Sequence, residues 1–338
     1  MGYIIMEQIH AILFVVSFLF SIHPGAQAIG INYGLLGDNL PAPADVISEL
    51  RARGISKIRV FEPRPDVLTA LIDSGISVII GTRNEDLEAL ASDLSVAQSW
   101  VETNVVPYQS SVNILCISAG NEVIPGELAA YVPGAMQNLD SALTAANLAI
   151  QVSTAVSMQV LAASYPPSQG AFSAETNPVM AQVVAFLASK NSPLLLNVYP
   201  YFARAGDPVN VPSDYALFED TASPVPDSPF IYYNLFDAMV DAAYAALEKV
   251  GGTGVEIIVS ETGWPTDGSS EATVENAQRY VNNLIQHVSS GAGTPRRPGK
   301  DIETYIFAMF NEDLKPGGVE QHWGLYYPNL VEVYHANF

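Results

Sequence analysis

The sequence has few of the residues and motifs that indicate disulfides, metal sites or phosphate-binding loops. Its 338 residues include one cysteine, Cys116, which excludes both an intrachain disulfide and a cysteine-based zinc site. Cys116 lies in an apolar run, and such a position predicts a buried thiol. The five histidines lack metal-ligand spacing, and no glycine-rich phosphate loop follows a strand-like segment. We therefore expect neither a metal nor a cofactor.

Positive charge is also scarce. The chain has 14 Lys and Arg residues against 35 Asp and Glu residues, and its net charge is −21. A chain this acidic is repelled by phosphate backbones and by anionic lipid surfaces. The charge therefore argues against nucleic acid and membrane surfaces as partners and favours a neutral substrate. We expect a monomer.

Long apolar runs are confined to the N-terminus. Residues 11–22 are almost wholly apolar, and AQA at 26–28 is a small-x-small cleavage site, although no Lys or Arg precedes the run. The run is too short to span a bilayer. It predicts a signal peptide over 1–28 and a secreted mature chain over 29–338. We expect neither a lipid anchor nor N-glycosylation, because the C-terminus has no hydrophobic tail and no Asn-x-Ser/Thr acceptor occurs.

The mature chain alternates strand-like and helix-like segments. Short apolar runs that suit buried parallel strands lie at 29–34, 57–61, 77–82, 113–119, 150–156, 194–199, 255–260 and 304–310. Helical patterns lie between them, at 43–53, 65–73, 84–92, 96–105, 127–148, 178–188, 232–250 and 271–288. Eight such alternations predict a single-domain (β/α)₈ TIM barrel, although alternation alone also permits an open doubly wound sheet.

Carboxylates follow three of the predicted strands directly. The fourth strand runs into Asn121-Glu122, the seventh into Glu261 and the eighth into Asn311-Glu312. Barrel enzymes carry their catalytic groups at these strand ends. Two carboxylates across a barrel mouth can flank one glycosidic bond, and Asn121 can hydrogen-bond a sugar hydroxyl. A single carboxylate at a strand end is readily explained as the cap of a nearby helix. A pair of them with polar and aromatic neighbours favours a catalytic role.

Aromatic residues gather after the same strands. Tyr199 ends the sixth strand and Phe202 follows it, Trp264 follows Glu261, and Trp323 follows the eighth strand. Aromatic rings combine a large apolar area with a polar rim and pack well against sugar rings. Each ring alone is explained by core packing, but their shared position predicts a sugar-binding surface.

At these residues the sequence resembles plant endo-β-1,3-glucanases of glycoside hydrolase family seventeen. The matching motifs are GINYG at 30–34, AGNE at 119–122, SETGWP at 260–265, ETYIFAMFNE at 303–312 and WGLY at 323–326. The resemblance covers essentially the whole mature chain, and SETGWP is its most specific segment. VFEP at 60–63 departs from the family, which has a tyrosine–aspartate pair before the proline.

The resemblance implies a retaining endo-hydrolysis of β-1,3-glucan in a plant or fungal wall, in the apoplast. It assigns the acid/base role to Glu122 and the nucleophile role to Glu261. It implies supporting roles near the site for Glu312, Lys315 and Glu320. It also places Tyr33, Tyr199 and Phe202 along the substrate groove.

Three alternatives remain open from the sequence. The same fold can cleave mixed β-1,3-1,4-glucan, as a lichenase does. A retaining enzyme can also pass its glycosyl intermediate to a sugar instead of water. From a different class, the chain could be a sugar-binding or storage protein without catalysis, against which both glutamates argue.

The predicted signal peptide fixes where the mature protein starts. Protein made in a eukaryotic host should be exported and should begin at Ile29, because cleavage is expected after Ala28. N-terminal sequencing of the exported protein checks this expectation. A cytosolic product that keeps Met1 contradicts it.

Overall fold

The predicted strands close into a barrel. The computed structural model describes residues 28–338, so the predicted signal segment lies outside the described residues except for Ala28. The barrel strands are β1 (Ile29–Asn32), β2 (Lys57–Val60), β3 (Ser77–Gly81), β4 (Asn113–Asn121), β5 (Gln151–Ser157), β8 (Leu194–Asn197), β11 (Ile257–Thr262) and β14 (Thr304–Ile306). All neighbours pair in parallel, and β1 pairs with both β2 and β14. This closure confirms the (β/α)₈ barrel and excludes the open sheet.

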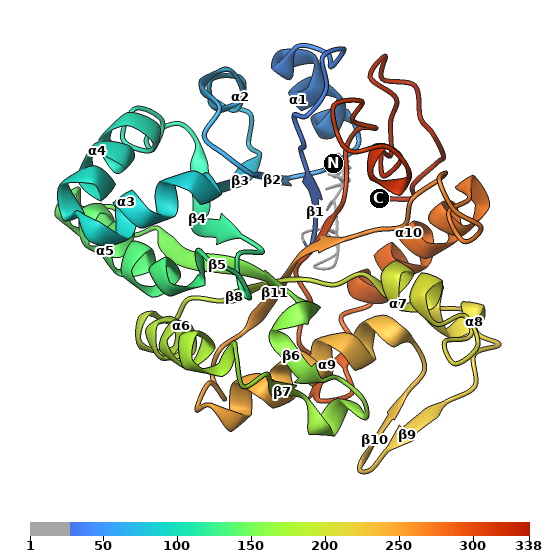
Figure 1. The fold of residues 1–338 in the computed structure, drawn as a ribbon. Helices are drawn as coiled ribbons and strands as arrows, with labels where there is room; N and C mark the ends of the chain where they lie inside the picture. Colours follow the sequence, from blue (N-terminus) through green and yellow to red (C-terminus); the bar gives the residue numbers. More distant parts are fainter. Residues whose placement is uncertain (1–27) are drawn as a thin grey trace, which may run out of the picture.

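Helices surround the barrel on all sides, as Figure 1 shows in a view onto its mouth. The main ones are α1 (Pro43–Ala52), α2 (Pro65–Ala70), α3 (Leu87–Ser92), α4 (Leu94–Asn104), α5 (Val132–Ala145), α6 (Asn177–Lys190), α9 (Leu235–Lys249) and α10 (Val274–Ser289). Their apolar faces point inward: α10 buries Tyr280, Leu284 and Val288, which recur every four residues. Among residues 28–338, no helix is both long and apolar enough to cross a membrane.

The barrel interior is filled by side chains below the mouth. A small apolar cluster contains Cys116, Leu195 and Tyr305, all with almost no exposed surface. Gly30 of β1 faces the Tyr305 ring, and a Cβ atom there would lie 2.5 Å from it. Burial raises the pKa of Cys116 to about 12, so the thiol stays protonated, as its apolar surroundings predicted. The barrel is therefore a packed core with an open upper face.

Several boundaries differ from the predicted ones. The last strand was expected to reach residue 310 but ends at Ile306, and the following residues pair with the closing loop, through Phe310 and Tyr326. The helix expected over 127–148 begins as a 3₁₀ turn at Ala129–Tyr131 and becomes α5 only at Val132. Apolar periodicity marks buried positions but not the residue at which a hydrogen-bond pattern changes.

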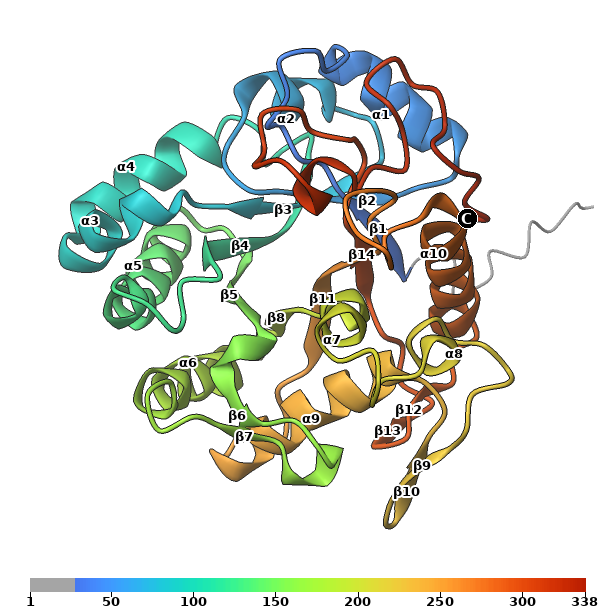
Figure 2. The ribbon, with the colours of Figure 1, turned by 45° about the vertical axis from the view of Figure 1, so that its right-hand side comes forward.

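Additional short elements lie between the barrel strands. Beyond the predicted elements, the structure has helices α7 (Pro200–Gly206) and α8 (Ser213–Ala216) and the ribbons β6 (Leu161–Ala163) with β7 (Ala171–Phe172), β9 (Val225–Asp227) with β10 (Phe230–Tyr232), and β12 (Gly293–Thr294) with β13 (Arg297–Pro298). Figures 1 and 2 show β6–β7, β9–β10, α7 and α8 along one side of the barrel mouth. They extend the upper face beyond the eight strand ends.

Candidate active site

The two predicted catalytic glutamates sit at the mouth on different strands. Glu122 follows the last residue of β4, and Glu261 is the fifth residue of β11. Glu122 has a left-handed backbone with φ of 55°, which is uncommon for a residue other than glycine. Its amide donates to the carbonyl of Ala155, at 2.9 Å, which anchors this turn to β5. The turn directs the Glu122 side chain toward the groove.

Glu261 is paired with a buried cation. Arg59 of β2 donates through Nη1 to Oε1 of Glu261 at 2.7 Å, and the exposed side-chain fractions are 1% and 7%. The hydroxyl of Tyr199 donates to the other oxygen, Oε2, at 2.8 Å. Burial and the Glu261 charge raise the pKa of Tyr199 well above its usual value, so this hydroxyl keeps its proton. Both oxygens of Glu261 therefore face donors.

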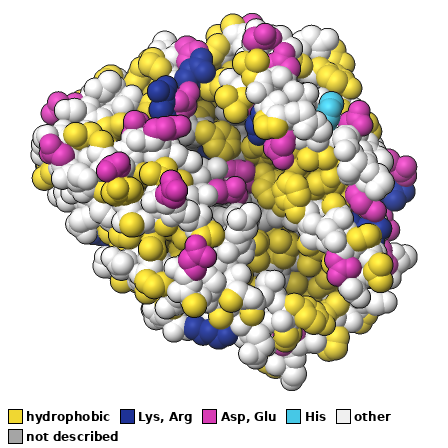
Figure 3. All heavy atoms as spheres, in the orientation of Figure 1, with side chains coloured by type: hydrophobic (Ala, Val, Ile, Leu, Met, Phe, Trp, Pro, Cys, Tyr) yellow, Lys and Arg dark blue, Asp and Glu magenta, His cyan; other side chains and the backbone are white. Residues whose placement is uncertain are grey.

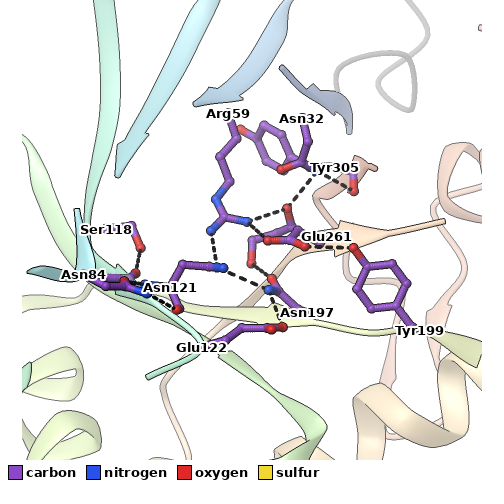
Figure 4. A network of polar contacts seen from close by, with 12 residues as sticks. Asn32, Arg59, Asn84, Ser118, Asn121, Glu122, Asn197, Tyr199, Glu261 and Tyr305 are labelled. Carbon is purple, nitrogen blue, oxygen red and sulfur yellow. Dashed lines mark hydrogen bonds and ion pairs between the residues drawn. The ribbon is translucent and has the colours of Figure 1, made fainter. Parts of the chain in front are cut away.

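Arg59 was not found from the sequence. Its guanidinium also donates to Oδ1 of Asn121, at 2.8 Å, and to the carbonyl of Ser260, at 3.1 Å. It lies 4.7 Å from the centre of the Phe61 ring. Figure 4 shows it joining three strand ends. The available signal was an arginine between two apolar residues of the predicted strand, since a buried charge has to have a partner.

The hydrogen-bond partner of Glu122 is a neutral side chain. Nδ2 of Asn197 donates to its Oε1 at 2.8 Å, and Oδ1 of Asn197 accepts from Ser260 Oγ at 2.7 Å, which fixes the amide orientation. Glu122 is exposed to the groove. Even so, the displacement of water by the surrounding protein raises the pKa of Glu122, and the charge of Glu261 raises it further. The two carboxyls thus have unlike surroundings (Figure 4).

Asn121 is oriented by the same network. Its Oδ1 accepts from Arg59 and, at 3.3 Å, from Nδ2 of Asn197. The Asn84 side chain holds its backbone, accepting from Asn121 N at 2.8 Å and donating to Asn121 O at 3.0 Å. With Oδ1 occupied by two donors, the amide nitrogen of Asn121 is the atom left to hydrogen-bond a sugar hydroxyl.

A long groove runs across the mouth past both glutamates. Its volume is about 1720 Å³, larger than the roughly 300–1,000 Å³ of pockets for small ligands. Tyr33, Tyr199, Phe202 and Trp323 are among its lining residues. The Tyr199 and Trp323 rings meet edge to face at 5.1 Å between centroids. Figure 3 shows carboxylates at the centre of the hollow with hydrophobic side chains around them.

The three supporting residues also line the groove. Glu312 is almost fully buried and accepts from the backbone amide of Leu36 at 2.7 Å. Lys315 Nζ lies 3.6 Å from Oε2 of Glu312 and 4.1 Å from the centre of the Phe307 ring. Glu320 is half-buried in the groove wall, and its charge contributes to the raised pKa of Glu122. The structure brings all three within the same hollow.

Trp264 requires a correction as a substrate-binding residue. It has no exposed surface and is absent from the groove lining. Its indole nitrogen donates to the carbonyl of Glu271 at 2.7 Å, and its ring packs against Tyr201 and Tyr280. Trp264 therefore supports the wall from behind. Its position after a strand end did not reveal that the chain turns inward there.

No cluster of metal ligands occurs in the described part of the chain. Two carboxyl groups in unlike surroundings, at the mouth of a barrel with an aromatic groove, are the arrangement of a glycoside hydrolase.

Comparison with known proteins gives the family. Residues 29–338 match the model of "Glycosyl hydrolases family 17". The chain is 52% identical over 317 residues to a Hordeum vulgare protein named "Putative glucan endo-1,3-beta-glucosidase GVI", covering 93% of this chain and 98% of that one. It is 46% identical over 316 residues to Hordeum vulgare "Lichenase-2", covering 93% of this chain and 100% of that one. The chain belongs to glycosyl hydrolase family 17.

A solved structure supports the same assignment. The β-1,3-glucanase and allergen CJP38 of Cryptomeria japonica pollen superposes with a TM-score of 0.90 at 47% identity. The match covers 92% of this chain and 98% of the other. The barrel and its added elements are therefore shared over nearly the full length.

The Arg59–Glu261 pair predicts a large effect of removing the arginine. Arg59→Met should cost about 3–5 kcal/mol of unfolding free energy, because Glu261 is left buried without its cation. Turnover should also fall about 10- to 100-fold, because the positioning bond to the nucleophile is lost. Denaturant unfolding and initial rates on a soluble β-glucan check both.

The matched control is Arg64→Met. Arg64 makes a surface ion pair with Asp66, with exposed side-chain fractions of 33% and 47%, and its loss should cost less than about 1 kcal/mol. Equal effects of the two substitutions contradict the importance assigned to the buried pair.

Proposed function

We propose that this protein is a secreted endo-β-1,3-glucanase that hydrolyses its substrate with retention of configuration. The observation that carries the proposal is the contrast between the two glutamates. Glu261 accepts hydrogen bonds from an arginine and a tyrosine hydroxyl, one on each oxygen. Glu122 faces an amide and has a raised pKa, which favours its protonated form. The residues therefore suit the nucleophile and acid/base roles respectively.

The proposed reaction has two displacements. Glu261 attacks the anomeric carbon while Glu122 gives its proton to the glycosidic oxygen, and the leaving chain departs. Glu122, now ionised, takes a proton from water, which attacks the anomeric carbon and releases the glycosyl group from Glu261. The carboxyl separation of about 5–5.5 Å that retaining enzymes have stays a prediction.

The open groove supports endo action. On one side of the glutamates it reaches the ion pair of Glu62 and Arg83, and on the other it reaches Tyr165 and Met239. A polymer can therefore extend past the site in both directions. The relatives named glucan endo-1,3-beta-glucosidase support the β-1,3 linkage. We further propose export through the leader, action in the plant wall as a monomer, and one catalytic domain over 29–338.

Mixed-linkage cleavage is the second candidate, because the lichenase relative is 46% identical. Laminarin and lichenan distinguish the two. The protein should release oligosaccharides early from laminarin and act much more slowly on lichenan. Early proton NMR should show the β-anomer first. Faster cleavage of lichenan than of laminarin overturns the proposed β-1,3 specificity. Glucose as the only early product overturns endo action. Initial release of the α-anomer overturns retention of configuration.

Replacing each glutamate separately tests the two roles. Glu122→Ala should still form the glycosyl-enzyme from an aryl laminaribioside with a good leaving group, because departure then needs no proton. Azide should speed its turnover and give the β-glycosyl azide. Glu261→Gly should instead give the α-azide, because azide attacks the substrate directly. Rates on laminarin and NMR of the azide products check this. An α-azide from Glu122→Ala, or near-full laminarin activity in either variant, contradicts the roles.

The raised pKa of Glu122 fixes the sign of the pH dependence. The first step needs the protonated carboxyl, so kcat/KM on laminarin should fall as the pH rises through this raised pKa. The Glu122→Ala variant with the activated aryl substrate should lack this alkaline decline in glycosyl-enzyme formation. If the variant shows the same alkaline decline as the wild type, a group other than Glu122 causes the decline.

A further inference from the structure

Asn197, the last residue of β8, connects Glu122 with the strand that carries Glu261. Its Nδ2 donates to Glu122 Oε1 at 2.8 Å and to Asn121 Oδ1 at 3.3 Å, and its Oδ1 accepts from Ser260 Oγ at 2.7 Å. A side-chain amide has two N–H donors and an oxygen with two lone pairs, so both donors are used. The residue is also buried. Its amide therefore serves the protein network of Figure 4 and has no donor left for a sugar hydroxyl.

The orientation of this amide follows from groups that can each act in only one way. A guanidinium has donors but no acceptor, so the atom of Asn121 that faces Arg59 Nη2 at 2.8 Å must be its oxygen. An amide oxygen only accepts, so the atom of Asn197 that faces it must be the nitrogen. Ser260 then faces the oxygen of Asn197 and donates to it. The buried cation therefore decides that Asn197 offers a donor to Glu122.

This donor makes the two carboxyl oxygens of Glu122 unlike. Oε1 accepts from Asn197, whereas no group in the described part of the chain donates to Oε2. The carbonyl oxygen of a protonated carboxyl group is its stronger acceptor, so the bond from Asn197 favours the form with the proton on Oε2. Glu122 is exposed to the groove, and Oε2 is the oxygen left to face a substrate.

We infer that Asn197 is a positioning residue that selects Oε2 of Glu122 as the oxygen that donates the catalytic proton, and that Ser260 holds Asn197 in the required orientation. This inference rests on the proposed retaining hydrolysis. In the first step Glu261 bonds to the anomeric carbon, the proton moves from Oε2 to the glycosidic oxygen, and the bond between that oxygen and the anomeric carbon breaks.

In the second step the same oxygen of Glu122 takes the proton of the attacking water, while Asn197 continues to donate to Oε1. The water oxygen bonds to the anomeric carbon, and the bond to Glu261 breaks. One oxygen of Glu122 thus serves both steps, so its carboxyl group does not have to rotate between them.

Replacing Asn197 tests the selection. Asn197→Ala should lower kcat on laminarin about tenfold with KM little changed, because the lost bond orients the proton donor and does not hold the sugar. Formation of the glycosyl-enzyme from an aryl laminaribioside with a good leaving group should keep nearly its wild-type rate, because departure then needs no proton. Initial rates and single-turnover measurements check both expectations.

The pH profile of the same variant gives a second readout. The hydrogen bond from Asn197 lowers the pKa of Glu122, against the larger effects of burial and of the Glu261 charge, which raise it. Loss of this bond therefore raises the pKa, and the alkaline decline of kcat/KM should move to higher pH. The other charged groups that act on Glu122, namely Arg59, Glu261 and Glu320, are unchanged in the variant.

A milder variant and a matched control accompany it. Ser260→Ala removes only the hydroxyl that orients the amide, so it should lower kcat about threefold and move the alkaline decline in the same direction. The control is Ser153→Ala. Ser153 is a buried serine of β5 whose hydroxyl donates to the carbonyl of Pro193 at 2.7 Å, and its loss should leave kcat and the pH profile unchanged. Thermal unfolding of each variant checks folding.

Neutron diffraction from crystals of the deuterated wild-type protein, at a pH below the alkaline decline, locates the proton directly. Deuterium should lie on Oε2 of Glu122, with an amide deuterium of Asn197 directed at Oε1. Deuterium on the oxygen that faces Asn197 overturns the inference. So does a folded Asn197→Ala protein in which only KM changes, the alkaline decline stays in place, or both substrates lose rate equally. A wild type that leaves laminarin uncut overturns the proposed function itself.

Discussion

The buried ion pair of Arg59 and Glu261 is the constraint on which the mouth of this barrel depends. A guanidinium in the interior is tolerated only if charged or polar partners replace the water it has lost. Arg59 finds them on β4 and β11, so three strands are tied together where the chemistry is proposed. The same arginine makes no direct bond to Glu122, whose hydrogen-bond partner is the Asn197 amide.

From this pair the remaining polar contacts follow in order. Arg59 fixes which atom of Asn121 is the acceptor, and Asn197 then donates to both Asn121 and Glu122. Ser260 completes the arrangement by donating to Asn197. One buried cation and a few amides thus give the two glutamates different hydrogen-bond partners, and the pKa of Glu122 is raised. No metal ligand cluster contributes to this within residues 28–338.

The sequence allowed the barrel and both glutamates to be predicted because these features are local. Apolar runs alternating with helices mark the strands, and Glu122 and Glu261 come directly at strand ends. Arg59 was not predicted as a site residue, because a strand pattern does not show which charged side chain points inward. The prediction that Trp264 binds substrate was wrong for a related reason. Trp264 follows a strand end, yet its side chain is buried and donates to the backbone of Glu271. Such facts depend on packing between distant segments.

The backbone amide and hydroxyl of Ser168, between β6 and β7, each donate to the Asp227 carboxylate at 2.6 Å, and this anchoring separates two tasks within one chain. The groups proposed to cleave the bond lie at the ends of two barrel strands, whereas the wall that extends the groove is fastened by contacts among inserted segments. Insertions or deletions in those segments can therefore lengthen, shorten or reshape the wall during evolution while the reactive groups stay in register. Divergence among relatives in the polymer they degrade then requires no change at the strand ends.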